Sequence, residues 1–326
     1  MYRDRGQQPE HEPHPRKVAI VGTGKVGATF AYALLLSGLV GEIALIDVDR
    51  RRAEGEAMDL NHAVPLSHPT RIWAGDYPDC AGADVVVVAA GTAQRPGETR
   101  LDLVKRNATI FEDIIPRITA HNRGGILLIA TNPVDVLSYV AWKVSGFPAP
   151  RVIGSGTVLD TARFRYLLGE HLGVDPRSVH AYIIGEHGDS EVPVWSLANV
   201  AGMRLDDFCR REECDLGPEI RERIFEQTRN AAYEIIERKG ATHYAVAVGL
   251  LRIVESILRD QHTVLPVSSL VSGYYGLENV YLSLPAVVGR GGVQRVLHLP
   301  LSDEETQALR ESAAVLRGVL DGLDID

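Results

Sequence analysis

The segment around His187 has the residue types that proton transfer requires. His187 stands in the run GEHGD (residues 185–189), directly after a predicted strand. Histidine titrates near neutral pH, so one side chain can both donate and accept a proton. A loop histidine without a function is the alternative, and the spacing alone does not exclude it.

Asp160 and Arg163 form a second pair of candidate functional residues. They are three positions apart in a segment that we expect to be helical after Thr157, so they share one helix face. The planar guanidinium of arginine binds a carboxylate through two parallel hydrogen bonds, which suits recognition of an organic acid. An ordinary surface ion pair is the alternative interpretation.

A glycine-rich run near the N-terminus has the spacing of a dinucleotide-binding loop. Gly22, Gly24 and Gly27, with Val26 between the last two, follow a predicted strand and precede a predicted helix. The first glycine permits a tight turn, the second lets the backbone approach a pyrophosphate, and the third allows close helix packing. The N-terminus of the helix offers free N–H groups to phosphates.

Asp47 ends the next predicted strand, 20 residues after Gly27. A carboxylate there accepts hydrogen bonds from ribose hydroxyls and repels a 2′-phosphate, which favours NAD over NADP. Arg50, Arg51 and Arg52 follow, and one of them could pair with such a phosphate, although a solvated helix face explains them more simply.

The order and content of four segments are similar to those of the lactate/malate dehydrogenase family, and most similar to its bacterial L-lactate branch. The resemblance covers residues 16–326 and rests on residues 90–107, 131–135, 154–165 and 184–195. It implies reversible, NADH-dependent reduction of pyruvate to L-lactate. It also implies an NAD-binding domain over residues 16–154 and a catalytic domain over residues 155–326.

The resemblance implies a role for each candidate residue. His187 donates the proton, Asp160 orients the imidazole, and Arg163 binds the substrate carboxylate. Arg100, in a mobile loop over the site, polarises the ketone oxygen as that loop closes. Asn132 contacts the substrate oxygen and the nicotinamide region, with a bond to Pro133 that is often cis in the family, and Thr242 walls the substrate pocket.

Gln94 distinguishes lactate from malate chemistry. The family's malate enzymes usually have arginine at this position, which pairs with the second carboxylate of oxaloacetate. A neutral glutamine would leave that carboxylate buried without a cation, which is costly. Arg95 could in principle substitute, but adjacent loop residues usually point in different directions. We therefore expect pyruvate to be preferred, with malate dehydrogenase as the alternative.

Arg165 follows Arg163 by two positions and so projects from a nearly opposite side of the helix, at about 100° per residue. In bacterial members of the family the matching arginine and a histidine at the position of His180 bind fructose 1,6-bisphosphate between subunits. The resemblance therefore implies an activated homotetramer. A surface Arg/His pair is the alternative.

Apolar runs locate the elements that position these residues. Residues 17–21, 42–47, 84–90 and 126–130 are short, apolar and rich in β-branched residues, as expected for strands buried on both faces. The helices expected between them predict an α/β Rossmann-type parallel sheet. The second half predicts a mixed α+β domain, with a strand at 180–184, helices over 219–239, 242–258 and from Ser302, and strands at 263–268 and 278–284.

Composition limits the other functions. The net charge of −9 argues against nucleic acid as a partner, and no apolar run approaches the roughly 18 residues of a membrane span. We expect a cytoplasmic protein with a disordered tail over residues 1–15. The cysteines, which are Cys80, Cys209 and Cys214, show no disulfide or zinc pattern, so we expect reduced thiols and no metal site.

Two further classes of protein were weighed. An NAD-using glycoside hydrolase shares this type of fold but needs a metal site built with cysteine and histidine, and the three cysteines do not match its motif. A dinucleotide-sensing protein would be expected to have lost part of the catalytic set, which is intact here. Oxidation of NADH with pyruvate separates both classes from a dehydrogenase.

Overall fold

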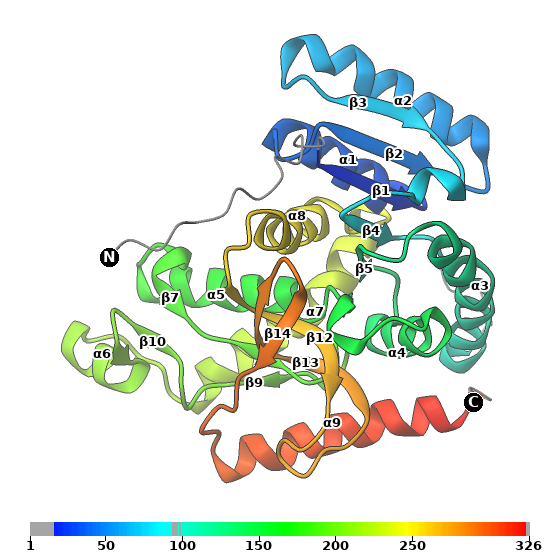
Figure 1. Cartoon of the computed structure of the whole chain (residues 1–326). Coiled ribbons are helices and arrows are strands. Elements are labelled where there is room, and N and C mark those ends of the chain that lie inside the picture. The colour runs from blue at the N-terminus through cyan, green and yellow to red at the C-terminus, as the bar shows by residue number, and fades with distance from the viewer. Residues whose placement is uncertain (1–15, 93–96, 98, 324–326) are drawn as a thin grey trace, which may run out of the picture.

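A single nine-stranded sheet runs through the computed structural model, which describes residues 16–92, 97 and 99–323 (Figure 1). The predicted tail, residues 1–15, lies outside the described residues, as do Gln94 and Arg95. In spatial order, the strands are β14 (Gly292–Val296), β13 (Val280–Gly289), β12 (Thr263–Val271), β6 (Val152–Gly154), β5 (Ile126–Ile129), β4 (Val85–Val88), β1 (Lys17–Val21), β2 (Glu42–Ile46) and β3 (Arg71–Ala74).

The two halves of the chain contribute different kinds of strand to this sheet. The six strands from β6 to β3 pair in parallel, and their central members are buried on both faces, which confirms the predicted Rossmann-type sheet. The strands of the second half extend the same sheet in the antiparallel sense, through a pairing of Ser268 in β12 with Gly154 in β6.

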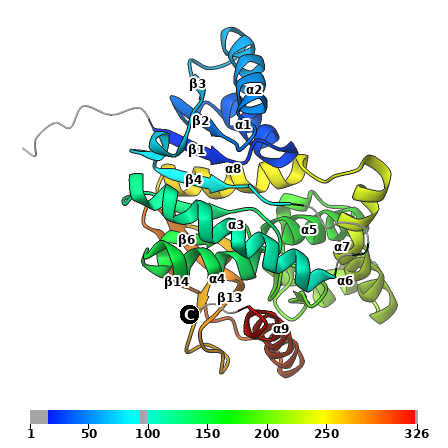
Figure 2. The ribbon, with the colours of Figure 1, turned by 90° about the vertical axis from the view of Figure 1, so that its right-hand side faces the viewer.

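Helices cover both faces of the sheet. Phe30 of α1 and Leu250 of α8 pack on one face, while Phe111 of α3, Leu137 of α4 and Leu309 of α9 pack on the other. Figure 2 shows α3 and α4 side by side on their face. The helices are α1 (Lys25–Ser37), α2 (Arg50–Ala63), α3 (Arg100–His121), α4 (Val134–Ser145), α5 (Val158–Leu172), α6 (Leu205–Glu212), α7 (Pro218–Lys239), α8 (Tyr244–Leu258) and α9 (Asp303–Asp321).

A smaller core lies between α5, α6, α7 and two short sheets. Phe164 of α5 and Phe208 of α6 are buried in it, together with Ile224 of α7. The short strands are β7 (Val179–His180), β10 (Asn199–Val200) and β11 (Met203–Arg204) in one sheet, and β8 (Ile183–Ile184) and β9 (Val192–Pro193) in the other. This core fixes one side of α5, the helix that carries Asp160 and Arg163.

Several predicted boundaries differ from the structure. The strand predicted over residues 180–184 is two strands, because β7 pairs with β10 while β8 pairs with β9. The helix predicted from Thr242 begins at Tyr244, which leaves Thr242 in the preceding loop. Strands β3 and β6 were not predicted, since β3 is a half-exposed edge strand and β6 has only three residues.

The expectation of reduced cysteines is wrong for two of the three. Cys209 and Cys214 form a disulfide, whereas Cys80 is a buried free thiol. Helix α6 ends at Glu212, and the left-handed backbone of Glu213 turns the chain back so that the Cys214 N–H donates to the Cys209 carbonyl. The turn places the two Cα atoms 4.5 Å apart, within the range that a disulfide needs.

No helix among the described residues has the length and apolar composition that a membrane crossing requires.

Candidate active site

The glycine loop connects β1 to α1 and has the conformation that its glycines predict. Gly22 has φ +99°, and a Cβ there would lie 2.4 Å from the Ala90 nitrogen. A Cβ on Gly27 would lie 1.9 Å from the Gly22 carbonyl oxygen. At Gly24 a Cβ would meet nothing within 4 Å, so this part of the loop faces open space. A phosphate can therefore approach the backbone at Gly24, directly before the N-terminus of α1.

Asp47 follows β2 and holds this loop in place. Its Oδ2 accepts hydrogen bonds from the N–H and hydroxyl of Thr23, at 2.7 and 2.9 Å. The carboxylate is half-buried at the C-terminal edge of the parallel strands, where it can also receive ribose hydroxyls. Of the nearby arginines, Arg50 pairs with Glu54 and Arg52 with Asp49, so neither guanidinium is directed to Asp47. These residues fit NAD, and they fit NADP poorly.

A cavity of about 150 Å³ brings together residues predicted for the cofactor and for the substrate. It lies between the start of α1, the end of β5, α5 and the loop before α8. The predicted residues that line it are Val26, Asn132, Arg163, His187 and Thr242. A nicotinamide bound here would therefore meet a substrate held by the residues of α5.

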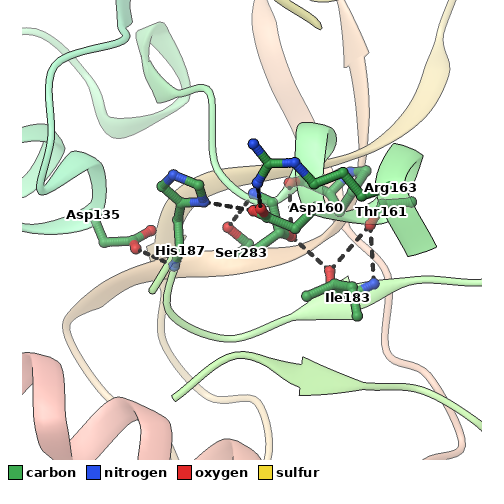
Figure 3. A network of polar contacts seen from close by, with 9 residues as sticks. Asp135, Asp160, Thr161, Arg163, Ile183, His187 and Ser283 are labelled. Atoms are coloured by element: carbon green, nitrogen blue, oxygen red, sulfur yellow. Dashed lines mark hydrogen bonds and ion pairs between the residues drawn. The ribbon is translucent and has the colours of Figure 1, made fainter. Parts of the chain in front are cut away.

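His187, Asp160 and Arg163 form one connected group (Figure 3). The Nδ1 atom of His187 lies 2.5 Å from Oδ2 of Asp160, while Nη1 of Arg163 donates to Oδ1 of Asp160 at 2.9 Å. The Asp160 side chain is only 3% exposed, and those of Arg163 and His187 are 12% and 22% exposed. The carboxylate thus uses one oxygen for each cationic partner, and the Nε2 edge of His187 stays available to a substrate.

The surroundings of His187 favour its protonated form. Burial alone would lower the pKa of His187, but the charge of Asp160 and its hydrogen bond to the ring, with smaller contributions from Asp135 and Glu191, raise the pKa to about 9. Burial alone would raise the pKa of Asp160, but His187 and Arg163 together hold it below its usual value. The pair is therefore an imidazolium and a carboxylate at neutral pH, ready to donate a proton.

Three hydroxyl side chains that the sequence analysis missed, those of Thr157, Thr161 and Ser283, fix α5 relative to the histidine loop. Thr161 and Ser283 are labelled in Figure 3. The hydroxyl of Thr157 donates to the Ile183 carbonyl at 2.6 Å, and the Ile183 N–H donates to the hydroxyl of Thr161 at 2.9 Å. The Thr157 N–H donates to the Ser283 hydroxyl at 3.0 Å. These bonds tie the first turn of α5 to β8 and β13, so the distance between Asp160 and His187 is set by strand positions.

Asp135 is a fourth residue that sequence reasoning did not identify. Its Oδ2 accepts the backbone N–H of His187 at 2.7 Å (Figure 3). Burial raises the pKa of Asp135 to about 6, against the opposing effects of Ser268 and His187. The chain reaches Asp135 through a cis peptide bond between Asn132 and Pro133, as the family resemblance implied. The motif TNPVD did signal the site, but only Asn132 was selected from it.

Two predicted residues remain without a described position at the site. Gln94 lies outside the described residues, and Arg100 begins α3 with a side chain that the structure does not describe. The predicted effector residues are neighbours on another surface: Nε of Arg165 donates to the Ala181 carbonyl at 2.8 Å, and its guanidinium lies over the ring of Tyr182. His180, in β7, is exposed beside them.

A larger hollow, of about 540 Å³, lies at the opposite end of the parallel strands. It is lined by Ile126 at the start of β5 and by Arg16, Arg123 and Arg290, and it contains none of the predicted catalytic residues. The smaller cavity, where the glycine loop and His187 meet, is therefore the candidate active site.

Comparison with known proteins finds similarity over nearly the whole chain. Residues 16–154 match the NAD binding domain of lactate/malate dehydrogenase, and residues 157–323 match the alpha/beta C-terminal domain of the same family. An L-lactate dehydrogenase of Acetivibrio thermocellus is 56% identical over 95% of this chain and 98% of its own length. One from a Synechococcus species is 56% identical over 94% of this chain and 99% of its own.

Solved structures agree with these sequence matches. A minor L-lactate dehydrogenase from Enterococcus mundtii, crystallised in a ligand-bound form, superposes with a TM-score of 0.93 at 43% identity. The alignment covers 95% of this chain and 99% of that chain. With the glycine loop, Asp47 and the His187–Asp160–Arg163 group in place, the chain belongs to the lactate/malate dehydrogenase family, an NAD-dependent oxidoreductase family.

Proposed function

We propose that the protein is an L-lactate dehydrogenase that reduces pyruvate to L-lactate, with His187 as the proton donor. The observation that carries this proposal is the cavity in which Val26 of the cofactor loop meets Arg163 and His187. NADH, when bound, supplies the hydride that reduces C2 of pyruvate. The similarity to proteins named L-lactate dehydrogenase supports the same substrate.

The chain's own residues perform the remaining tasks. Arg163 binds the substrate carboxylate through its guanidinium, while Asp160 keeps both that guanidinium and the imidazole in position. His187 delivers its Nε2 proton to the ketone oxygen, and the charge that develops there is stabilised by the cations around it. From the sequence we assign Asn132 and Arg100 to the same oxygen. Lactate oxidation uses the reverse steps, with neutral His187 as the base.

The preference for pyruvate over oxaloacetate is the first prediction, because Gln94 provides no cation for a second carboxylate. The ratio of kcat/KM for the two keto acids with NADH measures this preference. We expect pyruvate to be favoured by about a hundredfold or more, roughly 2.7 kcal/mol of transition-state stabilisation.

Two results of this experiment would overturn the proposal. A preference for oxaloacetate would show that Arg95 or another cation reaches the pocket, and would reassign the protein to malate chemistry. Absence of turnover with both substrates would favour a protein that binds the dinucleotide without catalysis. A His187→Gln variant that binds NADH but does not turn over pyruvate is the matched control for the assigned proton donor.

We also propose that a bisphosphate, fructose 1,6-bisphosphate, activates the enzyme between the subunits of a homotetramer. Arg165 supports this proposal, since it leaves α5 away from the active-site cavity and lies beside the exposed His180. A two-fold axis near these residues would bring together two cationic sets, which suits a ligand with two phosphates.

A further inference from the structure

Glu191 is a buried carboxyl group to which the proposed reaction gives no role. It lies four residues after His187 and directly before β9, and it is only 6% exposed. Its backbone N–H donates to the Gly188 carbonyl at 3.2 Å, which closes the histidine loop. Its Oε1 atom is buried and has no hydrogen-bond partner among the described residues. A buried carboxyl oxygen without a partner is costly, so its retention needs an explanation.

The charged groups around Glu191 are those of the candidate active site. Asp160 and Arg163 face it from α5, His187 from its own loop, and Arg229 from α7. Arg163 is the cation assigned to the substrate carboxylate, and it already shares Asp160 with His187. A negative charge on Glu191 would therefore act on the same arginine that the substrate must bind.

The balance of these interactions keeps Glu191 protonated at neutral pH. Burial and the charge of Asp160 raise the pKa of Glu191, and the cations His187, Arg163 and Arg229 lower it by less, so that the pKa is about 8. With Glu191 neutral, Asp160 is the carboxylate that pairs with both His187 and Arg163, and Arg163 has no second negative partner in Glu191.

We propose that Glu191 is a pH-dependent positioning residue, which leaves Arg163 available to the substrate while it is protonated and weakens substrate binding once it ionises. The inference rests on the proposed function, because it assigns Arg163 to the carboxylate of a keto acid. Repulsion between the ionised Glu191 and that carboxylate is strong because both lie in a largely buried site with little screening. Increasing pH therefore has two effects. Ionisation of Glu191 reduces the affinity of the site for the keto acid, and deprotonation of His187 removes the proton that the reaction needs.

The prediction is a pyruvate kcat/KM that falls with pH in two separable steps. If only enzyme with protonated Glu191 binds pyruvate, a pKa of about 8 lowers kcat/KM roughly tenfold between about pH 6.5 and pH 9. Loss of the His187 proton, with a pKa of about 9, adds about a further twofold. In Glu191→Gln, whose side chain stays neutral, we expect kcat/KM to fall by no more than about fourfold over the same pH range. The difference from the unchanged enzyme should appear in KM, because ionisation of Glu191 weakens substrate binding.

The ratio of kcat/KM at the two pH values is measured for each variant separately, so a loss of activity that is equal at both pH values cancels. Glu226→Gln is the matched control, because it removes the charge of an exposed glutamate from α7, close to Arg229 in sequence. We expect this control to retain the pH profile of the unchanged enzyme. An equal fall with pH in Glu191→Gln and in the unchanged enzyme would overturn the inference, while the pyruvate activity itself would still support the proposed function.

Infrared spectroscopy of the unchanged enzyme tests the same inference without a substitution. A protonated buried carboxyl group has a C=O stretching band that disappears on ionisation. We expect one such band to be present at neutral pH and to be lost near pH 8, whereas Asp135, with a pKa of about 6, has already ionised. Absence of any protonated-carboxyl band at neutral pH would contradict the inference even if Glu191→Gln failed to fold.

Discussion

The pairing of His187 with Asp160 determines how the reaction and the stability of the protein respond to pH. The raised pKa of about 9 keeps His187 protonated, so kcat for pyruvate reduction, measured at saturating pyruvate, is maintained up to about that pH and falls above it, while lactate oxidation rises. The raised pKa of His187 also stabilises the fold: this contribution is complete below about pH 6.5, the usual pKa of histidine, and is lost as pH rises through about 9. The contribution of His187 to the free energy of unfolding therefore declines between about pH 6.5 and about pH 9.

Asp160→Asn tests this coupling directly. Without the carboxylate, the pKa of His187 loses its main raising influence, while burial still lowers it. We expect the alkaline limit of kcat for pyruvate reduction to move from about pH 9 to below about pH 7, with a loss of kcat at neutral pH of about a hundredfold or more. A pH–rate profile of kcat at saturating pyruvate measures both effects. A variant that is slower but keeps its limit near pH 9 would show that Asp160 does not control the protonation of His187.

At the scale of elements, the glycine loop separates the requirements of folding from those of cofactor binding. Gly27 packs against the Gly22 carbonyl, so any side chain at Gly27 displaces the first turn of α1 from β1. Gly24 has the extended backbone of an N-cap residue and open space beside it, so a methyl group there disturbs nothing in the chain itself. Only a bound pyrophosphate would meet that methyl group.

Matched alanine substitutions distinguish these two roles. We expect Gly24→Ala to retain the melting temperature of the unchanged protein and to weaken NADH binding about tenfold, because the phosphates can no longer approach the backbone. Gly27→Ala should lower both stability and NADH affinity, since its Cβ would overlap the Gly22 oxygen. Thermal unfolding and fluorescence titration with NADH are the measurements. Equal NADH affinity in Gly24→Ala and the unchanged protein would place the pyrophosphate elsewhere.

The elements that the sequence predicted are those whose signals are local. Apolar runs located β1, β2, β4 and β5, and the glycine spacing located the start of α1. The missed positioning residues depend on contacts between distant segments, as when Asp135 receives the N–H of a residue 52 positions away. The contact between Asp160 and His187 followed from the family resemblance, because no spacing rule brings together residues 27 positions apart.

At the scale of the whole molecule, we predict that effector binding and subunit assembly are coupled, because the proposed effector site lies between subunits. We expect fructose 1,6-bisphosphate to lower the pyruvate concentration for half-maximal rate and to stabilise a tetramer in light scattering. Arg165→Gln should remove both responses, with His180→Gln as a second variant. Because Arg165 also donates to the Ala181 carbonyl, thermal unfolding must show that the variant is folded. A saturation curve that the bisphosphate leaves unmoved across pH would reject this proposal.

The disulfide shows why pairing of cysteines is not readable from their spacing alone. The five-residue separation of Cys209 and Cys214 matches no common motif, and the pair meets only because α6 ends in a left-handed turn at Glu213. Phe208 and Leu216, on either side of that turn, are buried in the smaller core, whose packing exists only in the folded chain.

The pairing of β12 with β6 has a consequence for how such proteins recombine. Because the last three strands of the sheet come from the second half, removing that half would expose the edge of β6 and the apolar face beneath it. The two backbone hydrogen bonds between Gly185 and Ser283 likewise tie the loop of His187 to β13. A cofactor-binding half transplanted onto an unrelated partner would therefore need that partner to supply a matching antiparallel strand.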